Sequence, residues 1–289
     1  MQLGRLPVVC TLVLAQAGCK NDQGLAGFSL QGVAWVAGDF DATEQVLSRL
    51  AVPGTAYEGY IVGPATGAEA VGGDGLTPTV EALLGGPQAD GEAELDRHDA
   101  VFLNSGVRGL GALVYNGLDP DDALVSDPEV VAGVVAWVEG GGVLVASDWA
   151  YDLVEEGWPD AVTFAREEEG LDGAQAGLSE RVLATVEDPA AATALGADSV
   201  SLAFDYGYWA VMEEVHPDVL VHLRGDVSFR VDEDQGQADL PEVPLLVSFA
   251  AGAGRVVLSS FHWRAQAPAM ADLLLPAVVQ GLPLGEATP

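Results

Sequence analysis

The stretch Glu139–Trp158, EGGGVLVASDWAYDLVEEGW, limits the possible folds more than any other part of the chain. Its three glycines at 140–142 can end a helix, because glycine accepts left-handed and extended backbone without steric cost. The apolar run Val143–Ala146 then has the length of a strand and no polar alternation, which indicates burial on both faces in a parallel sheet covered by helices. Ligands of such sheets bind beyond the carboxyl ends of the strands. We therefore expect any functional site near residues 147–149, where a new helix starts.

Two earlier segments of the same kind predict neighbouring strands. They are GVAWVAG at 32–38 and the run Ala100–Leu103 in DAVFLNSG. Helix signals follow each of them: Asp41–Glu44 has the spacing of a capping box, and Asp127-Pro128 fits an N-cap with proline at the first helical position. A further short strand is predicted at Tyr57–Val62. Alternation of strands and helices indicates an α/β fold.

The last third of the chain predicts antiparallel pairing. Its strand candidates at 219–223, 227–231 and 245–248 alternate apolar and polar residues more than the early ones do, as expected when a sheet has one solvated face. LLVSF and RVVLSSFHW are joined by a glycine-bearing turn, which favours a hairpin, and Ala267–Gly281 predicts a closing helix. We predict a flavodoxin-like α/β fold with a mostly parallel sheet, helices on both faces and an antiparallel C-terminal hairpin.

The charge balance excludes some partners. The chain has 44 acidic and 11 basic residues, for a formal net charge of -33. Nucleic acid is not expected as a partner, because no basic patch is present to neutralise phosphates. The acidic run Asp232-Glu233-Asp234 leaves two alternatives, a calcium site or a solvated hairpin tip, and it lacks the regular ligand spacing of a helix-loop-helix calcium site.

The N-terminal segment differs from the rest of the chain. Arg5 precedes the apolar run Leu6–Ala15, and Ala17-Gly18 places small residues before Cys19. The segment resembles a bacterial lipoprotein signal, which implies a signal peptide at 1–18, acylation of Cys19, a tether at 19–27 and a domain at 28–289. The protein would then be anchored by lipid in the cell envelope, at the outer membrane or its periplasmic face. Gln16 stands where leucine is usual, so ordinary secretory cleavage, or none, stays open.

Cysteine usage agrees with this interpretation. Both cysteines, Cys10 and Cys19, lie in the N-terminal segment. The remaining chain therefore has neither a disulfide nor a cysteine nucleophile.

Three loops should meet at the carboxyl edge of the predicted sheet: Asn104-Ser105-Gly106, Ser147-Asp148-Trp149 and the loop at His262. The strands DAVFLNSG, GGVLVAS and GRVVLSSFH with these loops resemble the class I glutamine amidotransferase-like superfamily, which includes the ThuA-like domains, over roughly Gly32 to Gln280. The resemblance implies that Ser147 takes the place of the nucleophilic cysteine and His262 that of the catalytic histidine. Ser105 and Gly106 would then form the oxyanion loop.

The chain departs from that pattern at two positions. Serine replaces the reactive cysteine, and Trp263-Arg264 replaces the glutamate expected after the histidine, so glutamine hydrolysis is not expected. We hold two function classes open. The first is a non-catalytic, amidotransferase-like binding or interaction module; the second is a serine hydrolase acting on a carbohydrate or ester through Ser147, His262 and Asp148.

Other roles compete for the same residues. Asp148 can cap the following helix, and His262 can be a base, a ligand of a metal with Asp148 or Asp152, or a hydrogen-bonded structural residue. We predict no metal and no cofactor. The residues predicted to bind a small-molecule or carbohydrate ligand are Asn104, Ser105, Gly106, Trp149, Asp152 and Trp263. A group of aromatic residues can line a sugar-binding cleft or form core: Trp149, Tyr151, Trp158, Tyr206, Tyr208, Trp209 and Trp263.

Overall fold

The computed structural model describes residues 32–59, 78–86, 93–107, 109–110, 119, 122–166, 172–232 and 236–280. Cys19 and the predicted signal peptide lie outside these residues, and so do Glu233 and Asp234 of the acidic run. No helix within the described ranges is long and apolar enough to cross a membrane.

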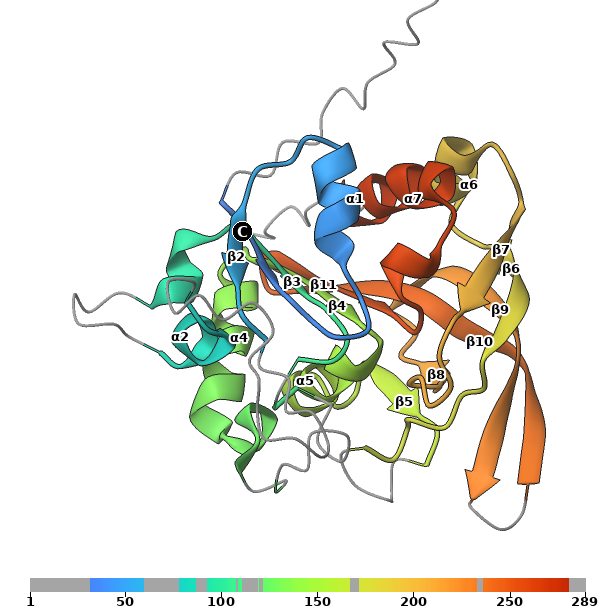
Figure 1. Ribbon diagram of the computed structural model, residues 1–289, viewed down its shortest axis with the longest axis horizontal. Coiled ribbons are helices and arrows are strands. Elements are labelled where there is room, and N and C mark those ends of the chain that lie inside the picture. The colour runs from blue at the N-terminus through green and yellow to red at the C-terminus, as the bar shows by residue number, and fades with distance from the viewer. Residues whose placement is uncertain are drawn as a thin grey trace, which may run out of the picture.

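One nine-stranded sheet dominates the fold, in the order β2-β1-β3-β4-β11-β10-β9-β6-β7 (Figure 1). Its first five strands are parallel to one another, and their order is the flavodoxin order. These strands are β2 (Thr55–Tyr57), β1 (Val33–Val36), β3 (Ala100–Leu103), β4 (Val143–Ser147) and β11 (Gly254–Ser259). The predicted fold class is confirmed, and the three buried runs are adjacent parallel strands.

The other half of the sheet is antiparallel, and two of its strands, β9 and β10, are longer than predicted. Its strands are β10 (Gly236–Ala251), β9 (Leu220–Asp232), β6 (Glu180–Val186) and β7 (Ser199–Phe204). The predicted strands at 219–223 and 227–231 form one continuous strand, β9. Gly225 between them packs closely, since a Cβ there would lie 2.7 Å from Val182 Cγ1. A separate pair, β5 (Val162–Phe164) and β8 (Met212–Val215), was not predicted.

Helices cover both faces of the sheet, as predicted. One face carries α1 (Thr43–Arg49), α6 (Pro189–Leu195) and α7 (Pro268–Gln280), and the other carries α2 (Val80–Leu84), α4 (Pro128–Glu139) and α5 (Tyr151–Gly157) (Figure 1). Short 3-10 turns lie at Glu94–Arg97, Leu124–Ser126, Asp148–Ala150 and Trp263–Ala265.

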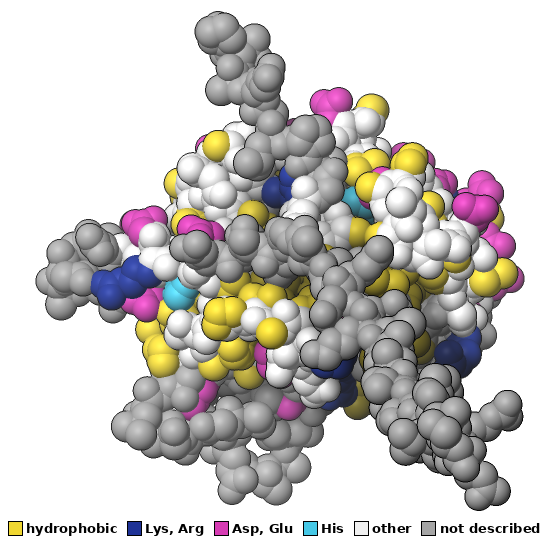
Figure 2. Space-filling view, turned by 90° about the horizontal axis from the view of Figure 1, so that it is seen from above, with side chains coloured by type: hydrophobic (Ala, Val, Ile, Leu, Met, Phe, Trp, Pro, Cys, Tyr) yellow, Lys and Arg dark blue, Asp and Glu magenta, His cyan; other side chains and the backbone are white. Residues whose placement is uncertain are grey.

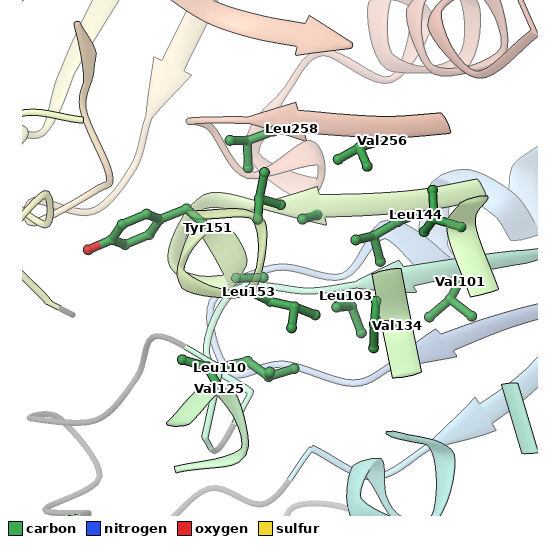
Figure 3. Packing of buried hydrophobic residues seen from close by; sticks show 14 of the residues in the cluster. Val101, Leu103, Leu110, Val125, Val134, Leu144, Tyr151, Leu153, Val256 and Leu258 are labelled. Carbon is green, nitrogen blue, oxygen red and sulfur yellow. The ribbon is translucent and has the colours of Figure 1, made fainter. Parts of the chain in front are cut away.

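Successive side chains of a strand point to opposite faces of the sheet, so the core has two layers, one on each face. Leu144 and Ala146 of β4 pack with the layer under α4 and α5, whereas Val145 belongs to the layer under α1 and α7. Val256 and Leu258 of β11 lie in the first of these layers, where Val256 is the cross-strand neighbour of Leu144 (Figure 3). Burial of each such side chain stabilises the fold by about 1.5–3 kcal/mol.

One predicted helix start is confirmed and one is wrong. The carboxylate of Asp127 accepts the N–H of Glu129 at 2.9 Å, and Pro128 opens α4. The predicted capping box at Asp41–Glu44 is absent, because the carboxylate of Asp41 binds other backbone groups and Ala42 is the N-cap of α1. The Asp41 side chain instead contributes to the site described next.

Candidate functional site

The candidate site lies at the carboxyl edge of the parallel strands, where the strand order reverses between β1 and β3. Asn104, directly after β3, is fully buried and joins three elements there. Its Oδ1 accepts the N–H of Thr43 at 2.9 Å, and its Nδ2 donates to the Val36 carbonyl at 2.9 Å and to Glu44 at 3.0 Å. Every polar group of this amide is therefore used within the protein.

The loop Ser105-Gly106 lies against the loop that follows β1. Gly106 has a φ of +93°, which favours glycine, and a Cβ on Gly38 would lie 2.2 Å from the carbonyl oxygen of Ser105. The N–H of Ser105 donates to Ser147 Oγ at 3.1 Å, and Ser105 Oγ donates to Asp148 Oδ2 at 3.1 Å. The structure thus brings together the loops after β3 and β4, two of the three loops that the sequence predicted would meet.

The sharp turn after β4 is made by Asp148. Its φ is +46°, whereas Ser147 before it has extended backbone with a φ of -121°. In a nucleophile elbow the nucleophile is the residue in the strained turn conformation. In this chain Asp148 has that conformation, whereas Ser147, the position that the resemblance implied, has ordinary extended backbone.

Asp148 is paired with His262. Asp148 Oδ2 contacts His262 Nε2 at 2.9 Å, and Oδ1 accepts the N–H of Ala210 at 2.7 Å. The other ring nitrogen, Nδ1, contacts Asp205 Oδ1 at 2.7 Å. Only 4% of the His262 side chain is exposed, so its imidazole is enclosed between two carboxylates.

These contacts set the protonation states of the site. Burial alone lowers the pKa of His262, but the hydrogen bonds to Asp148 and Asp205 outweigh it and raise that pKa to about 10. Burial raises the pKa of Asp148, and its bonds to His262 and Ala210 oppose that rise. For Asp205, burial acts to raise the pKa, but the bond to His262 brings it below its ordinary value. At neutral pH the site holds an imidazolium.

Asp41 fixes the position of the histidine loop, a role that the sequence did not reveal. Its carboxylate is 1% exposed and accepts the N–H groups of Trp263 and Arg264, each at 3.0 Å, and that of Ala42 at 2.7 Å. One side chain thereby joins the loop after β1 to the loop after β11. Its place directly before a helix suggested capping, and no local pattern pointed to a partner 222 residues away.

Asp152 and Trp263 do not line this site. Asp152 lies in the first turn of α5 and is fully buried. Burial, followed by the nearby carboxylate of Asp172, holds its pKa well above the ordinary value. Trp263 is 0% exposed and packs against Phe261. Both side chains are buried, and their role in binding a ligand stays a prediction.

The predicted aromatic group divides between core and surface. Tyr151, Trp209 and Trp263 are buried, whereas Tyr206 and Tyr208 are 45% and 55% exposed. Trp149 is partly exposed, and its Nε1 donates to the Tyr208 carbonyl at 2.5 Å.

Three aromatic side chains meet beside the site. Phe40 lies 4.8 Å from Trp149 and 5.3 Å from Tyr206 between ring centroids. Tyr206 also lies 5.7 Å from the ring of His262. We name Phe40, Trp149 and Tyr206 the aromatic rim.

Two kinds of binding surface are of interest among the described residues, a metal site and a basic patch for a polyanion. These residues contain no group of three His, Cys, Asp or Glu side chains that could hold a metal. Figure 2 shows no continuous basic patch on the described part of the face that it presents.

Comparisons with known proteins identify structures of similar fold. No family model and no curated protein matches the sequence. The chain is similar to a putative ThuA-like protein from Bacteroides uniformis, with a TM-score of 0.45 and 12% identity over 86% of this chain and 89% of that one. It is also similar to a putative GMP synthase subunit from Thermoplasma acidophilum, with a TM-score of 0.44 and 7% identity over 86% and 94% of the two chains. A cytoplasmic protein from Salmonella typhimurium gives a TM-score of 0.47 and 14% identity over 87% and 99%. These likenesses describe the overall fold alone.

Proposed function

We propose that this chain is a non-catalytic, amidotransferase-like binding or interaction module. The observation that carries this proposal is the enclosure of His262, whose two ring nitrogens contact the carboxylates of Asp148 and Asp205 at 2.9 and 2.7 Å. A general base must present an unprotonated nitrogen to its nucleophile. An imidazolium with a pKa of about 10 has no such nitrogen at neutral pH.

The contacts of Ser147 argue against the serine hydrolase alternative. Its Oγ accepts the N–H of Ser105 at 3.1 Å, and the side chain is 1% exposed. The Nε2 atom of His262, which would activate a serine nucleophile, binds Asp148 instead. The proton transfer that starts serine catalysis therefore has no acceptor.

Asp148 is equally unsuited to act as a carboxylate nucleophile. Both of its oxygens are held by hydrogen bonds, Oδ1 by Ala210 and Oδ2 by Ser105 and His262. The residue is 2% exposed. The residue in the sharp turn is thus held in an ion pair with His262 and does not present a reactive group.

The aromatic rim is the surface that we propose for ligand binding. Phe40, Trp149 and Tyr206 form edge-on ring contacts, and Tyr206 is 45% exposed. The guanidinium of Arg264 lies 5.8 Å from the Tyr206 ring and donates to its hydroxyl at 3.2 Å. Flat aromatic faces beside polar donors suit a small polar molecule or a carbohydrate.

A fluorophosphonate probe tests the absence of catalysis. We expect wild type and Ser147→Ala to remain equally unlabelled under conditions that label a reference serine hydrolase fully. Labelling of Ser147 that disappears in His262→Ala would overturn the proposal. Binding to the rim is checked separately by comparing sugar titrations of wild type and Trp149→Ala by NMR.

We further propose that the chain is exported and anchored in the cell envelope by acylation of Cys19. The apolar segment before Cys19 and the restriction of both cysteines to that segment support it. Metabolic labelling with a fatty-acid analogue should label wild type and the matched control Cys10→Ser, and should not label Cys19→Ser. Equal labelling of all three chains would contradict acylation at Cys19.

A further inference from the structure

Two cavities lie at the amino edge of the sheet, opposite the candidate site, where α4 ends and β3 and β4 begin. The first has a volume of about 340 Å³ and is lined by Asp96, His98, Asp99, Trp137 and the glycine turn 140–142, among others. The second has a volume of about 280 Å³ and has a largely apolar wall that includes Leu84 and Leu95. Asp96, Ala136 and Trp137 line both, so the two cavities meet at the indole ring.

The indole of Trp137 is held in a fixed orientation. Its Nε1 donates to the carbonyl of His98 at 3.1 Å. The ring also lies against Gly142, where a Cβ would come within 2.4 Å of the indole, so this position requires glycine. Because the ring is already fixed, a ligand that binds in the cavities would not have to order it.

The electrostatic environment of the first cavity favours a cation. Asp96 and Asp99 are among the residues that line it, and so is the turn at the C-terminal end of α4, a 12-residue helix whose dipole places partial negative charge there. Burial lowers the pKa of His98, so its ring adds no positive charge at neutral pH. Arg97, the neighbour of His98 in the chain, makes an ion pair with Glu94 at 3.4 Å.

We propose that these cavities form a binding site for a small organic cation with an apolar tail. The ammonium head would lie in the first cavity, against the indole of Trp137 and near Asp96 and Asp99. Cations bind the faces of aromatic rings, and tryptophan is the strongest partner. The tail would extend past Trp137 into the second cavity, beside Leu84 and Leu95. The size of the first cavity is within the usual range for small-molecule sites.

Titrations of the full-length chain test the role of charge. The probes are choline and neohexyl alcohol, in which carbon replaces the ammonium nitrogen at nearly the same shape. Choline should bind, and neohexyl alcohol should bind at least about fivefold more weakly. Pentyltrimethylammonium should bind more tightly than tetramethylammonium because its tail removes apolar surface from water. Absence of choline binding, or equal binding of choline and neohexyl alcohol, would refute the site.

Variants test the location. Trp137→Leu should weaken choline binding about fivefold. The double variant Asp96→Asn/Asp99→Asn should weaken it at low salt and flatten its salt dependence. Asp218→Asn removes a carboxylate that is 92% exposed and does not line either cavity, and it should bind choline as wild type does. If the folded double variant keeps wild-type affinity and salt dependence, the cation does not bind here.

Discussion

Replacement of Asp148 by asparagine should destabilise the protein by about 3 kcal/mol, because it removes the negative charge that pairs with the buried imidazolium of His262. A rise in the pKa of His262 from 6.5 to about 10 corresponds to about 5 kcal/mol of preferential stabilisation of the imidazolium. Asp205 supplies part of this amount. Burial of Asp148 raises its own pKa and opposes the pairing, so the expected loss lies near the lower end of the range of about 3–5 kcal/mol for broken buried pairs.

The loss should depend on pH in a defined direction. The folded pKa of His262 lies above its unfolded value, so the stabilisation is fully present below about pH 6.5 and disappears as pH rises through about 10. Urea unfolding of wild type and Asp148→Asn at about pH 6 and about pH 9 should therefore show a smaller difference at the higher pH. The control Asp218→Asn disrupts the exposed His216–Asp218 contact and should change stability by less than about 0.5 kcal/mol. A difference between wild type and Asp148→Asn that is below about 1 kcal/mol, or that grows with pH, would refute the reasoning.

Three further changes have expected outcomes. Asp152→Asn should stabilise the protein by at least about 1 kcal/mol at neutral pH, as measured by urea unfolding. Because the folded pKa of Asp152 is raised, this gain in stability should vanish as pH falls to about 3.8. A loss of stability at neutral pH would contradict the prediction. Gly38→Ala should destabilise the protein by more than about 1 kcal/mol and lower its melting temperature, because the new Cβ would collide with the carbonyl of Ser105. An unchanged melting temperature would show that the loop can move to accommodate the Cβ. Asp127→Ala should cost about 1 kcal/mol by removing the N-cap of α4, whereas Asp127→Asn should retain most of the stability in the same thermal measurement.

Local patterns predicted most of the parallel half of the fold. Uninterrupted apolar runs located β3 and β4, and Asp127-Pro128 located the start of α4, because each signal involves neighbouring residues only. The convergence of Ser105, Asp148 and His262 followed from strand direction, which brings the ends of parallel strands to one edge. The length of the β9–β10 hairpin was underestimated, because the segments predicted at 219–223 and 227–231 are parts of one strand.

The chemistry of the site depended on features that no local pattern contains. Aspartate tolerates a positive φ better than most residues, so the sequence could not show whether residue 147 or 148 makes the turn. Asp148 and Asp152, both considered as metal ligands with His262, lie in different elements, the 3-10 turn and α5. Asp205 reaches His262 from the antiparallel half of the sheet, 57 residues earlier in the chain. That contact, which encloses the imidazole, became evident only from the tertiary structure.

The protonation state of His262 tests the central claim most directly. Proton and nitrogen NMR of the imidazole across a pH titration reports the two ring nitrogens separately. Enclosure by Asp148 and Asp205 predicts that both nitrogens carry protons through neutral pH and that the ring titrates near pH 10. An imidazole that titrates at or below about 6.5, the value of an unperturbed histidine, would contradict the pairing and restore His262 as a candidate general base.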